Sequence, residues 1–85
     1  MSSEQGSQTV TVRYWAAAQA AAGVPQESYP AGSVRQILEA ARLRHPELER
    51  VLAVATILHD GRVVRAADEV AAGDEVEVLP PFAGG

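Results

Sequence analysis

The sequence predicts an α+β domain in which one main helix crosses a mixed sheet of about five strands. One long helical pattern of apolar residues stands between two groups of short strand-like segments, and a valine-rich strand closes the order. A single long helix in that position has to bury its apolar stripe against one face of a sheet. The predicted domain covers residues 9–79, between a polar leader at 1–8 that we expect to be disordered and an extended tail at 80–85.

The first predicted strand covers 9–15, where β-branched and aromatic residues alternate. The residues that we expect to face the core are Val10, Val12 and Tyr14. Trp15, at the end of the strand, is then either a partly exposed contact or a cover for the edge of the core. A short alanine-rich helix over 16–23 and a polar edge strand over 26–29 follow.

The main helix has a clear start and a clear end. Ser33 is a good N-cap and Gln36 stands at the capping-box position. Pro46 ends the helical run, and His45 beside it is predicted to be a solvated last-turn residue. The apolar stripe that should face the sheet consists of Val34, Ile37, Leu38, Ala41 and, further along, Leu48.

The second half of the sequence predicts three more strands. The near-continuous apolar run at 51–58 is interpreted as a buried strand, the turn signal at 59–62 follows it, and 63–64 is a brief returning strand. In the last strand, at 75–79, the predicted core residues are Val76, Val78 and Leu79, with Glu75 and Glu77 facing water. We expect this strand to lie centrally beside the first, which is a β-grasp, ubiquitin-like plan.

The composition excludes several classes of function. The 85 residues include no cysteine, which excludes disulfides, a thiolate zinc site and a cysteine nucleophile. All seven basic side chains are arginine, so the chain cannot accept isopeptide bonds on its own lysines. A net charge of -4 argues against nucleic acid or an anionic membrane as partner and fits a basic protein better. With no membrane-length apolar stretch and no signal peptide, the cytoplasm is the expected location.

Motifs for catalysis and metal binding are missing as well. The sequence has no Gly-rich phosphate loop and no Ser/His/Asp set, and we predict no catalysis by this chain alone. His59 has no second ligand at metal-binding spacing, so no metal site is expected. We also expect no bound cofactor. An acidic set near the tail is either a solvated face or a docking surface for a basic partner: Asp68, Glu69, Asp74, Glu75 and Glu77.

The final segment, 80–85, has the features of a reactive tail. Pro80 and Pro81 stop the strand and stiffen the chain that follows. Gly84 and Gly85 lack Cβ atoms, so they can enter a narrow channel and leave the terminal carbonyl unhindered. Taken alone, the two glycines fit a frayed end equally well.

Three stretches together resemble the MoaD/ThiS family of sulfur carriers, and within it the small subunit of molybdopterin synthase. They are Ser33–Leu38, Ala72–Val76 and the ending Leu79–Gly85, in which Pro-Pro-x-x-Gly-Gly is the most specific element. The resemblance spans residues 10–85. The chain departs from the family where leucines and an arginine are usual, at Ala18, Gln19 and Ala20, and where an asparagine is usual, at His59-Asp60.

The resemblance implies a sulfur-transfer role. The Gly85 carboxylate would be adenylated with ATP by a MoeB-like, ubiquitin-activating-like enzyme and converted to a thiocarboxylate with sulfur from a persulfide donor. A large, MoaE-like subunit of molybdopterin synthase would receive the tail, which comprises Pro80, Pro81, Phe82, Ala83, Gly84 and Gly85. Partner contacts are implied for Trp15, Val63 and Leu79.

Three other functions remain open at this point. The chain could carry sulfur for another pathway, such as thiamine thiazole, cysteine or tRNA thiolation. It could be a ubiquitin-like modifier joined to target lysines through Gly85, or a binding module with an incidental tail.

Overall fold

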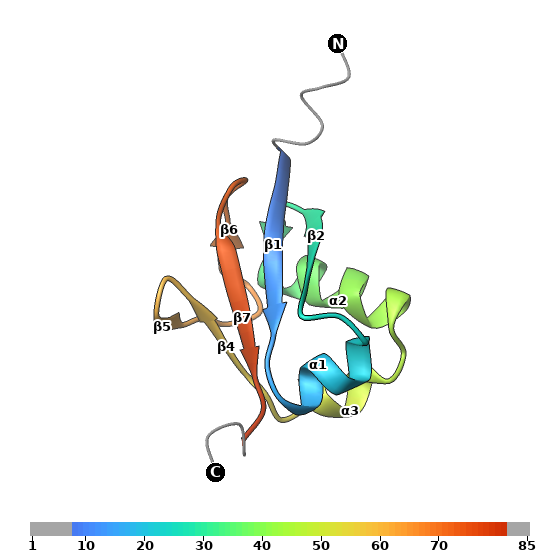
Figure 1. Ribbon diagram of the computed structural model, residues 1–85. Coiled ribbons are helices and arrows are strands. Elements are labelled where there is room, and N and C mark those ends of the chain that lie inside the picture. The colour runs from blue at the N-terminus through green and yellow to red at the C-terminus, as the bar shows by residue number, and fades with distance from the viewer. Residues whose placement is uncertain (1–7, 82–85) are drawn as a thin grey trace.

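A mixed five-stranded sheet with the strand order β2-β1-β7-β4-β5 forms the body of the protein (Figure 1). The computed structural model describes residues 8–81. The strands are β1 (Thr9–Tyr14), β2 (Gln26–Pro30), β4 (Thr56–His59), β5 (Arg62–Val63) and β7 (Glu75–Leu79). β1 and β7 run parallel at the centre, and every other neighbouring pair is antiparallel. The predicted β-grasp fold, with the last strand beside the first, is confirmed.

Three helices cover one face of this sheet, and the core lies between the helices and the sheet. They are α1 (Ala17–Ala22), α2 (Val34–Arg44) and α3 (Leu48–Leu52). In Figure 1, α2 crosses behind the strands, and α1 and α3 lie at the end where β7 leaves the sheet. The largest fully buried side chains are Tyr14, Ile37, Leu48, Val10, Val12, Val76 and Val78. The predicted core face of β1 is therefore confirmed.

Leu79 corrects the prediction for the last strand. It is only half-buried, whereas Val76 and Val78 are fully buried. Successive side chains of a strand point to opposite faces of the sheet. Leu79 therefore belongs to the face that the helices leave open.

Local signals in the sequence set the two ends of α2. The Ser33 side chain accepts a hydrogen bond from the Gln36 backbone, and the Gln36 side chain accepts one from the Ser33 backbone, which completes the predicted capping box. The helix ends at Arg44, before Pro46. Arg42 and Arg44 stand in its last turn, where the helix dipole favours positive charge.

The prediction of one buried strand over 51–58 is wrong. Val51 and Leu52 belong to α3, and the strand begins only at Thr56. A short apolar run does not distinguish a buried strand from a buried helical turn by its pattern alone. Pro46 starts a new turn, and Leu48, buried at the head of α3, orients this helix toward the core.

The connections between the strands contain a hairpin that the sequence predicts and a small second sheet that it does not. At the predicted hairpin between β4 and β5, Asp60 and Gly61 both have positive φ (58° and 78°), as a tight two-residue turn requires. The unpredicted feature is a small second sheet, in which β3 (Gly32–Ser33) pairs with β6 (Glu69–Val70).

None of the helices formed by residues 8–81 has the length and hydropathy that a membrane span requires.

Candidate functional site

The transition from packed strand to tail falls between the two prolines. Val78 and Pro80 are buried, whereas Pro81 is exposed. Pro80 therefore anchors the end of β7, and the chain leaves the body at Pro81. Both prolines were predicted as tail residues, and the structure places the first of them in the body. The remaining predicted tail residues, Phe82, Ala83, Gly84 and Gly85, lie outside the described residues.

The three predicted partner-contact residues lie on the face of the sheet opposite the helices. The register pairs Thr56 with Leu79, and Leu58 with both Glu77 and Val63, so these side chains share one face. The backbone N–H of Trp15 donates to Val78 O at 3.2 Å, which continues the β1–β7 pairing to the position beside Leu79. At about 4.8 Å per strand step, the row from Trp15 to Val63 spans roughly 15 Å.

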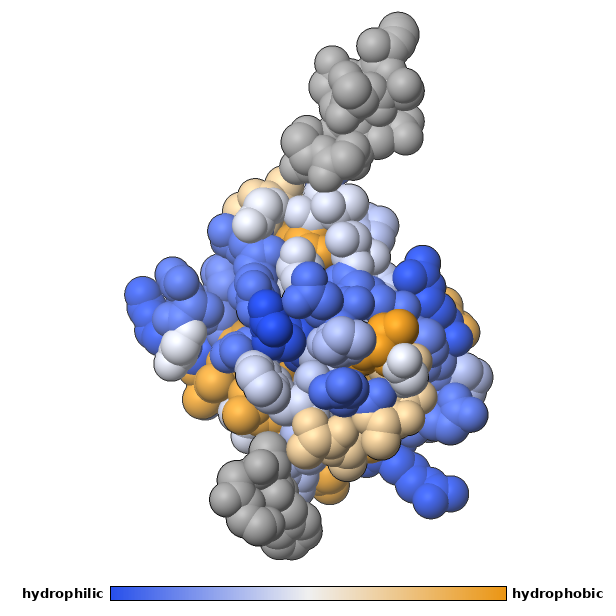
Figure 2. Space-filling model, viewed as in Figure 1, coloured by the Kyte–Doolittle hydropathy of each residue, from blue (hydrophilic) through white to orange (hydrophobic). Residues whose placement is uncertain are grey.

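This open face is apolar at its lower end. Trp15 is 41% exposed and Val63 68%, so both can meet a partner. Figure 2, in the view of Figure 1, shows apolar surface at the lower left beside β4 and β5, while the middle of this face is largely hydrophilic. The sequence allows Trp15 to be either a contact or a cover for the edge of the core. Its exposure and position favour a contact, although the role itself stays a prediction.

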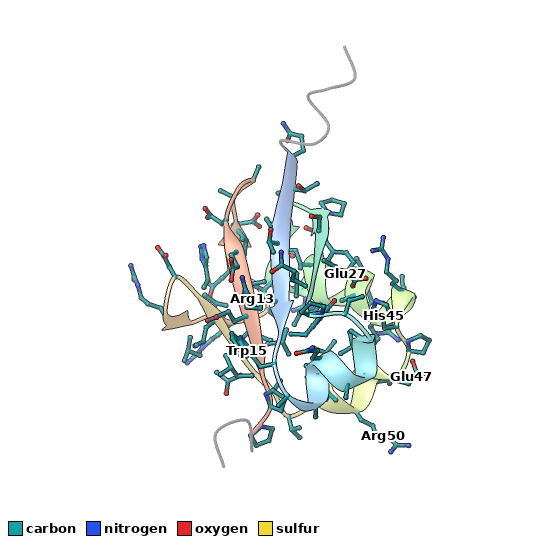
Figure 3. The ribbon with its side chains drawn as sticks, viewed as in Figure 1. Arg13, Trp15, Glu27, His45, Glu47 and Arg50 are labelled. Carbon is teal, nitrogen blue, oxygen red and sulfur yellow. The ribbon has the colours of Figure 1, made fainter. Side chains whose placement is uncertain are left out.

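Trp15 is held by charged neighbours on the same face. The Arg13 guanidinium lies 5.8 Å from the centre of the Trp15 ring, and its Nε donates to Glu75 at 2.9 Å. The Trp15 indole N–H donates to Glu77 at 3.3 Å. Figure 3 shows Arg13 and Trp15 one above the other along the front of β1. We call these four residues the Trp15 cluster; its bonds are exposed, so a partner can replace them at little cost.

An acidic hollow of about 320 Å³ adjoins the Trp15 cluster; His59, Asp60, Gly61, Asp74, Glu75 and Glu77 line it. His59 Nε2 lies 3.0 Å from Asp74 Oδ2, which gives this histidine a structural partner. Across residues 8–81, no group of three or more His, Cys, Asp or Glu side chains is arranged to hold a metal ion. The hollow offers carboxylates to a basic partner, and that use remains a prediction.

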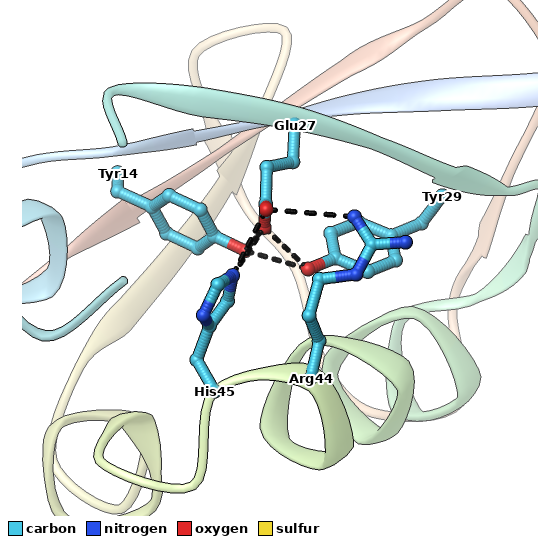
Figure 4. Close-up of polar contacts among 5 residues, drawn as sticks. All are labelled: Tyr14, Glu27, Tyr29, Arg44 and His45. Carbon is cyan, nitrogen blue, oxygen red and sulfur yellow. Dashed lines mark hydrogen bonds and ion pairs between the residues drawn. The ribbon is translucent and has the colours of Figure 1, made fainter. Parts of the chain in front are cut away.

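A second polar cluster lies on the helix-covered side, and the sequence pattern did not indicate it. Glu27 on β2 accepts hydrogen bonds from the Tyr14 hydroxyl at 3.0 Å and the Tyr29 hydroxyl at 2.5 Å. His45 Nε2 lies 2.9 Å from both carboxylate oxygens, and Arg44 reaches one of them at 3.4 Å (Figure 4). We call these five residues the Glu27 cluster. It joins the end of α2 to the edge strand.

The prediction that His45 is solvated is therefore wrong. Its side chain is 20% exposed, and its ring meets the Tyr14 ring edge-on at 6.5 Å between centroids. The reason is the geometry of the C-terminal end of α2. His45 caps the helix there, and its side chain lies against the core-facing side of β2. Alternation in β2 could have revealed the partner, because it places Glu27 and Tyr29 on the face that looks inward.

The surroundings of Glu27 favour its charged form. Burial opposes ionisation, but hydrogen bonds from Tyr29, His45 and Tyr14 outweigh it and hold the pKa of Glu27 below its usual value. Burial raises the pKa of Tyr14 and of Tyr29, and the hydrogen bonds to Glu27 act in the same direction. Residues 8–81 contain no buried side-chain polar atom without a hydrogen-bond partner. The Glu27 cluster is thus a satisfied structural network and not an open site.

Comparison with known proteins identifies the family of this chain. The sequence model of the ThiS family matches residues 12–85. The chain belongs to the ThiS family. The matched range includes β7, both prolines and the whole predicted tail, so membership extends to the candidate site. No curated protein matches the chain.

Solved structures similar to this ThiS-family chain share its fold along nearly their whole length. A putative molybdopterin converting factor subunit 1 from Pyrococcus furiosus is 32% identical, with a TM-score of 0.76 over 86% of this chain and 97% of that one. Small archaeal modifier protein 1 from Haloferax volcanii is 25% identical, with a TM-score of 0.79 over 91% and 99%. A complex of subunits 1 and 2 of molybdopterin-converting factor from Helicobacter pylori matches at 22% identity, a TM-score of 0.67 and coverages of 91% and 99%, which shows the fold alone.

Proposed function

We propose that this chain is a sulfur carrier that serves as the small subunit of molybdopterin synthase. The observation that carries the proposal is the end of β7. A central strand ends at a buried proline, an exposed proline follows, and the sequence continues for four residues to Gly-Gly. The body then acts as a handle, and the reacting group is the carboxylate of Gly85. Likeness to the Pyrococcus furiosus subunit supports this choice of pathway.

The chemistry needs an activating partner. A carboxylate is a poor electrophile, so Gly85 would first attack the α-phosphate of ATP, form an acyl adenylate and release pyrophosphate. A persulfide sulfur would then attack the acyl carbon and expel AMP. A thiol would cleave the resulting acyl disulfide, which leaves the thiocarboxylate on Gly85 and a disulfide on the donor. The chain has no cysteine, so the donor and the cleaving thiol would both belong to partners.

Two partners follow from this scheme. A MoeB-like adenylating enzyme would activate Gly85, and a MoaE-like large subunit would receive the tail and supply the acid and base groups. Trp15, Val63 and Leu79 would dock on either partner through the open face. The complex of subunits 1 and 2 in the Helicobacter pylori relative is a precedent for such a pairing. The basic side chains of the partner would meet the acidic hollow beside Trp15.

A second candidate is a protein modifier, and the observation in its favour is the likeness to small archaeal modifier protein 1. The two functions make different products from the same adenylate. In a carrier, sulfur attacks the acyl carbon and expels AMP. In a modifier, the acyl group is transferred, directly or through a thioester, to a lysine amine of a target, and an amide bond forms.

Intact-mass analysis of the chain purified from its native host separates the two. Replacement of one oxygen by sulfur at the C-terminus, together with co-purification of a MoaE-like protein, is the expected result. A ladder of lysine-linked adducts without any thiocarboxylate would reject the carrier in favour of the modifier. Co-purification with a thiazole or cysteine synthase in place of the MoaE-like protein would keep the carrier and reject the pathway.

A further inference from the structure

An apolar groove of about 370 Å³ lies where the chain leaves the body. The start of α1, the end of α3 and the two prolines form its walls, with Ala16, Ala17, Val51, Val54, Pro80 and Pro81 as lining residues. Val54 is 62% exposed, and Pro81 is exposed as well. Within residues 8–81, this apolar surface therefore remains uncovered.

The groove also has one positive charge, that of Arg50. Arg50 is exposed and makes no ion pair or side-chain hydrogen bond within the described part of the chain, whereas Arg42 pairs with Glu39 and Arg44 with Glu27. Figure 3 shows Arg50 extending from α3 at the end of the molecule where β7 leaves the sheet. An occupant that matches the groove needs an apolar group for its walls and an anion for Arg50.

The chain carries both groups immediately beyond Pro81. Residues 82–85 are Phe-Ala-Gly-Gly, so the only large apolar side chain of this segment directly follows a residue that lines the groove. Four residues reach at most about 14 Å, and Pro81, from which they extend, lines the same groove as Arg50. The anion in question is the carboxylate of Gly85, so this second contact rests on the proposed function, whereas the contact of Phe82 does not.

We propose that the groove binds the chain's own tail, with the Phe82 ring against Val51 and Val54 and the Gly85 carboxylate near Arg50. Pro81 already restricts the backbone next to Phe82, so seating the ring orders few additional bonds. Attachment to the same chain gives the ring a high effective concentration at the groove. A partner that takes up the tail has to displace Phe82 first. The groove thus holds the terminus, as carboxylate or thiocarboxylate, until such a partner binds.

Nuclear Overhauser effects in the free, full-length chain test the contact directly. We expect cross-peaks between the Phe82 ring and the Val54 methyl groups, and an upfield shift of those methyl groups from the ring current. Val54→Thr keeps the shape of the groove and the tail sequence but makes the wall polar. It should weaken the cross-peaks of Phe82 with Val51 and accelerate release of Gly85 by a carboxypeptidase several-fold.

Two arginine variants separate the two contacts. Arg50→Gln should loosen Gly84 and Gly85, measured by amide relaxation, and leave the Phe82 cross-peaks in place. Arg35→Gln is the matched control, because Arg35 is also exposed and helical but does not line the groove. It should change neither readout.

Absence of Phe82–Val54 cross-peaks, with equal carboxypeptidase rates for the parent chain and Val54→Thr, would overturn the proposal. Cross-peaks that arise only between differently labelled copies would overturn it in favour of a second copy as the occupant. None of these readouts requires sulfur transfer, so a failure to form the thiocarboxylate would reject the proposed function without affecting the Phe82 contact.

Discussion

The two polar clusters on either face of β1 contain similar groups but differ in their access to water. In the Trp15 cluster, the side chains of the ion pair between Arg13 and Glu75 are 36% and 43% exposed. In the Glu27 cluster, the Glu27 side chain is 13% exposed. A carboxylate that is removed from water and receives several hydrogen bonds contributes to stability, because its removal leaves buried donors unsatisfied. The exposed cluster contributes little and can exchange its bonds for those of a partner.

The largest expected effect is the loss of sulfur transfer on shortening the tail, which belongs to neither cluster. Deletion of Gly84 and Gly85 should reduce thiocarboxylate formation to background, because the reacting carboxylate and its unhindered carbonyl are lost. The free energy of unfolding should change by less than about 0.5 kcal/mol, since the packed chain ends at Pro80. Intact mass and urea unfolding measure the two quantities. Full sulfur transfer after the deletion would show that Gly84 and Gly85 do not carry the reacting group.

The next effect tests the stabilising cluster. Glu27→Ala should lower the free energy of unfolding by about 2 kcal/mol or more, because the hydroxyls of Tyr14 and Tyr29 lose their shared acceptor and the bond between them can satisfy only one of the two donors. Glu27→Gln keeps one acceptor and should cost less. Glu47→Gln is the control, since Glu47 is exposed and makes no side-chain cap bond at the start of α3 (Figure 3). Equal effects of Glu27→Ala and Glu47→Gln would contradict the structural role of the cluster.

The contribution of the Glu27 carboxylate to stability should depend on pH. The pKa of Glu27 is lower in the folded protein than the ordinary value of 4.5, so its ionised form stabilises the fold. This contribution is fully present above the unfolded-state pKa and is lost as the pH falls through the folded-state pKa. The difference in unfolding free energy between the parent chain and Glu27→Gln should therefore shrink below about pH 4. A difference that stays constant down to pH 2 would show that ionisation of Glu27 does not contribute.

On the open face, substitutions should affect binding and leave stability nearly unchanged. Trp15→Ala should weaken binding to a MoaE-like partner by about 2 kcal/mol, or roughly thirty-fold, because exposed aromatic residues at interfaces carry much of the binding energy. Val63→Ser should have a smaller effect in the same direction. Leu43→Ser is the control, since Leu43 is 69% exposed but lies on α2, behind the sheet. Calorimetric titration that shows equal losses for Trp15→Ala and Leu43→Ser would reject the open face as the interface.

The sequence predicted the core side of the first strand far better than the contacts between the helices and the sheet. Alternation places Val10, Val12 and Tyr14 inside, and the exposed position of Trp15 follows from the same period of two. Alternation in β2 places Glu27 and Tyr29 inward, but their contact with His45 depends on how closely the end of α2 approaches β2, and no local pattern gives that distance. The helix at Val51 also lacks a local signal, because a short apolar run has the same pattern in a strand and in a helical turn.

The smallest expected effect concerns the turn that joins the two faces, directly after Trp15. Ala16 has φ 49° and ψ -121°, and the Ala18 N–H donates to Trp15 O at 2.9 Å, so Ala16 occupies a turn position that favours glycine. Ala16→Gly should raise the free energy of unfolding by about 0.5–1 kcal/mol, because relief of backbone strain exceeds the added entropy of the unfolded chain. Gly23→Ala is the inverse control. Gly23 ends α1 at φ 80°, and alanine there should destabilise by about 1 kcal/mol. Urea unfolding of both variants decides the sign, and a loss of stability in Ala16→Gly would show that the backbone before α1 is not strained.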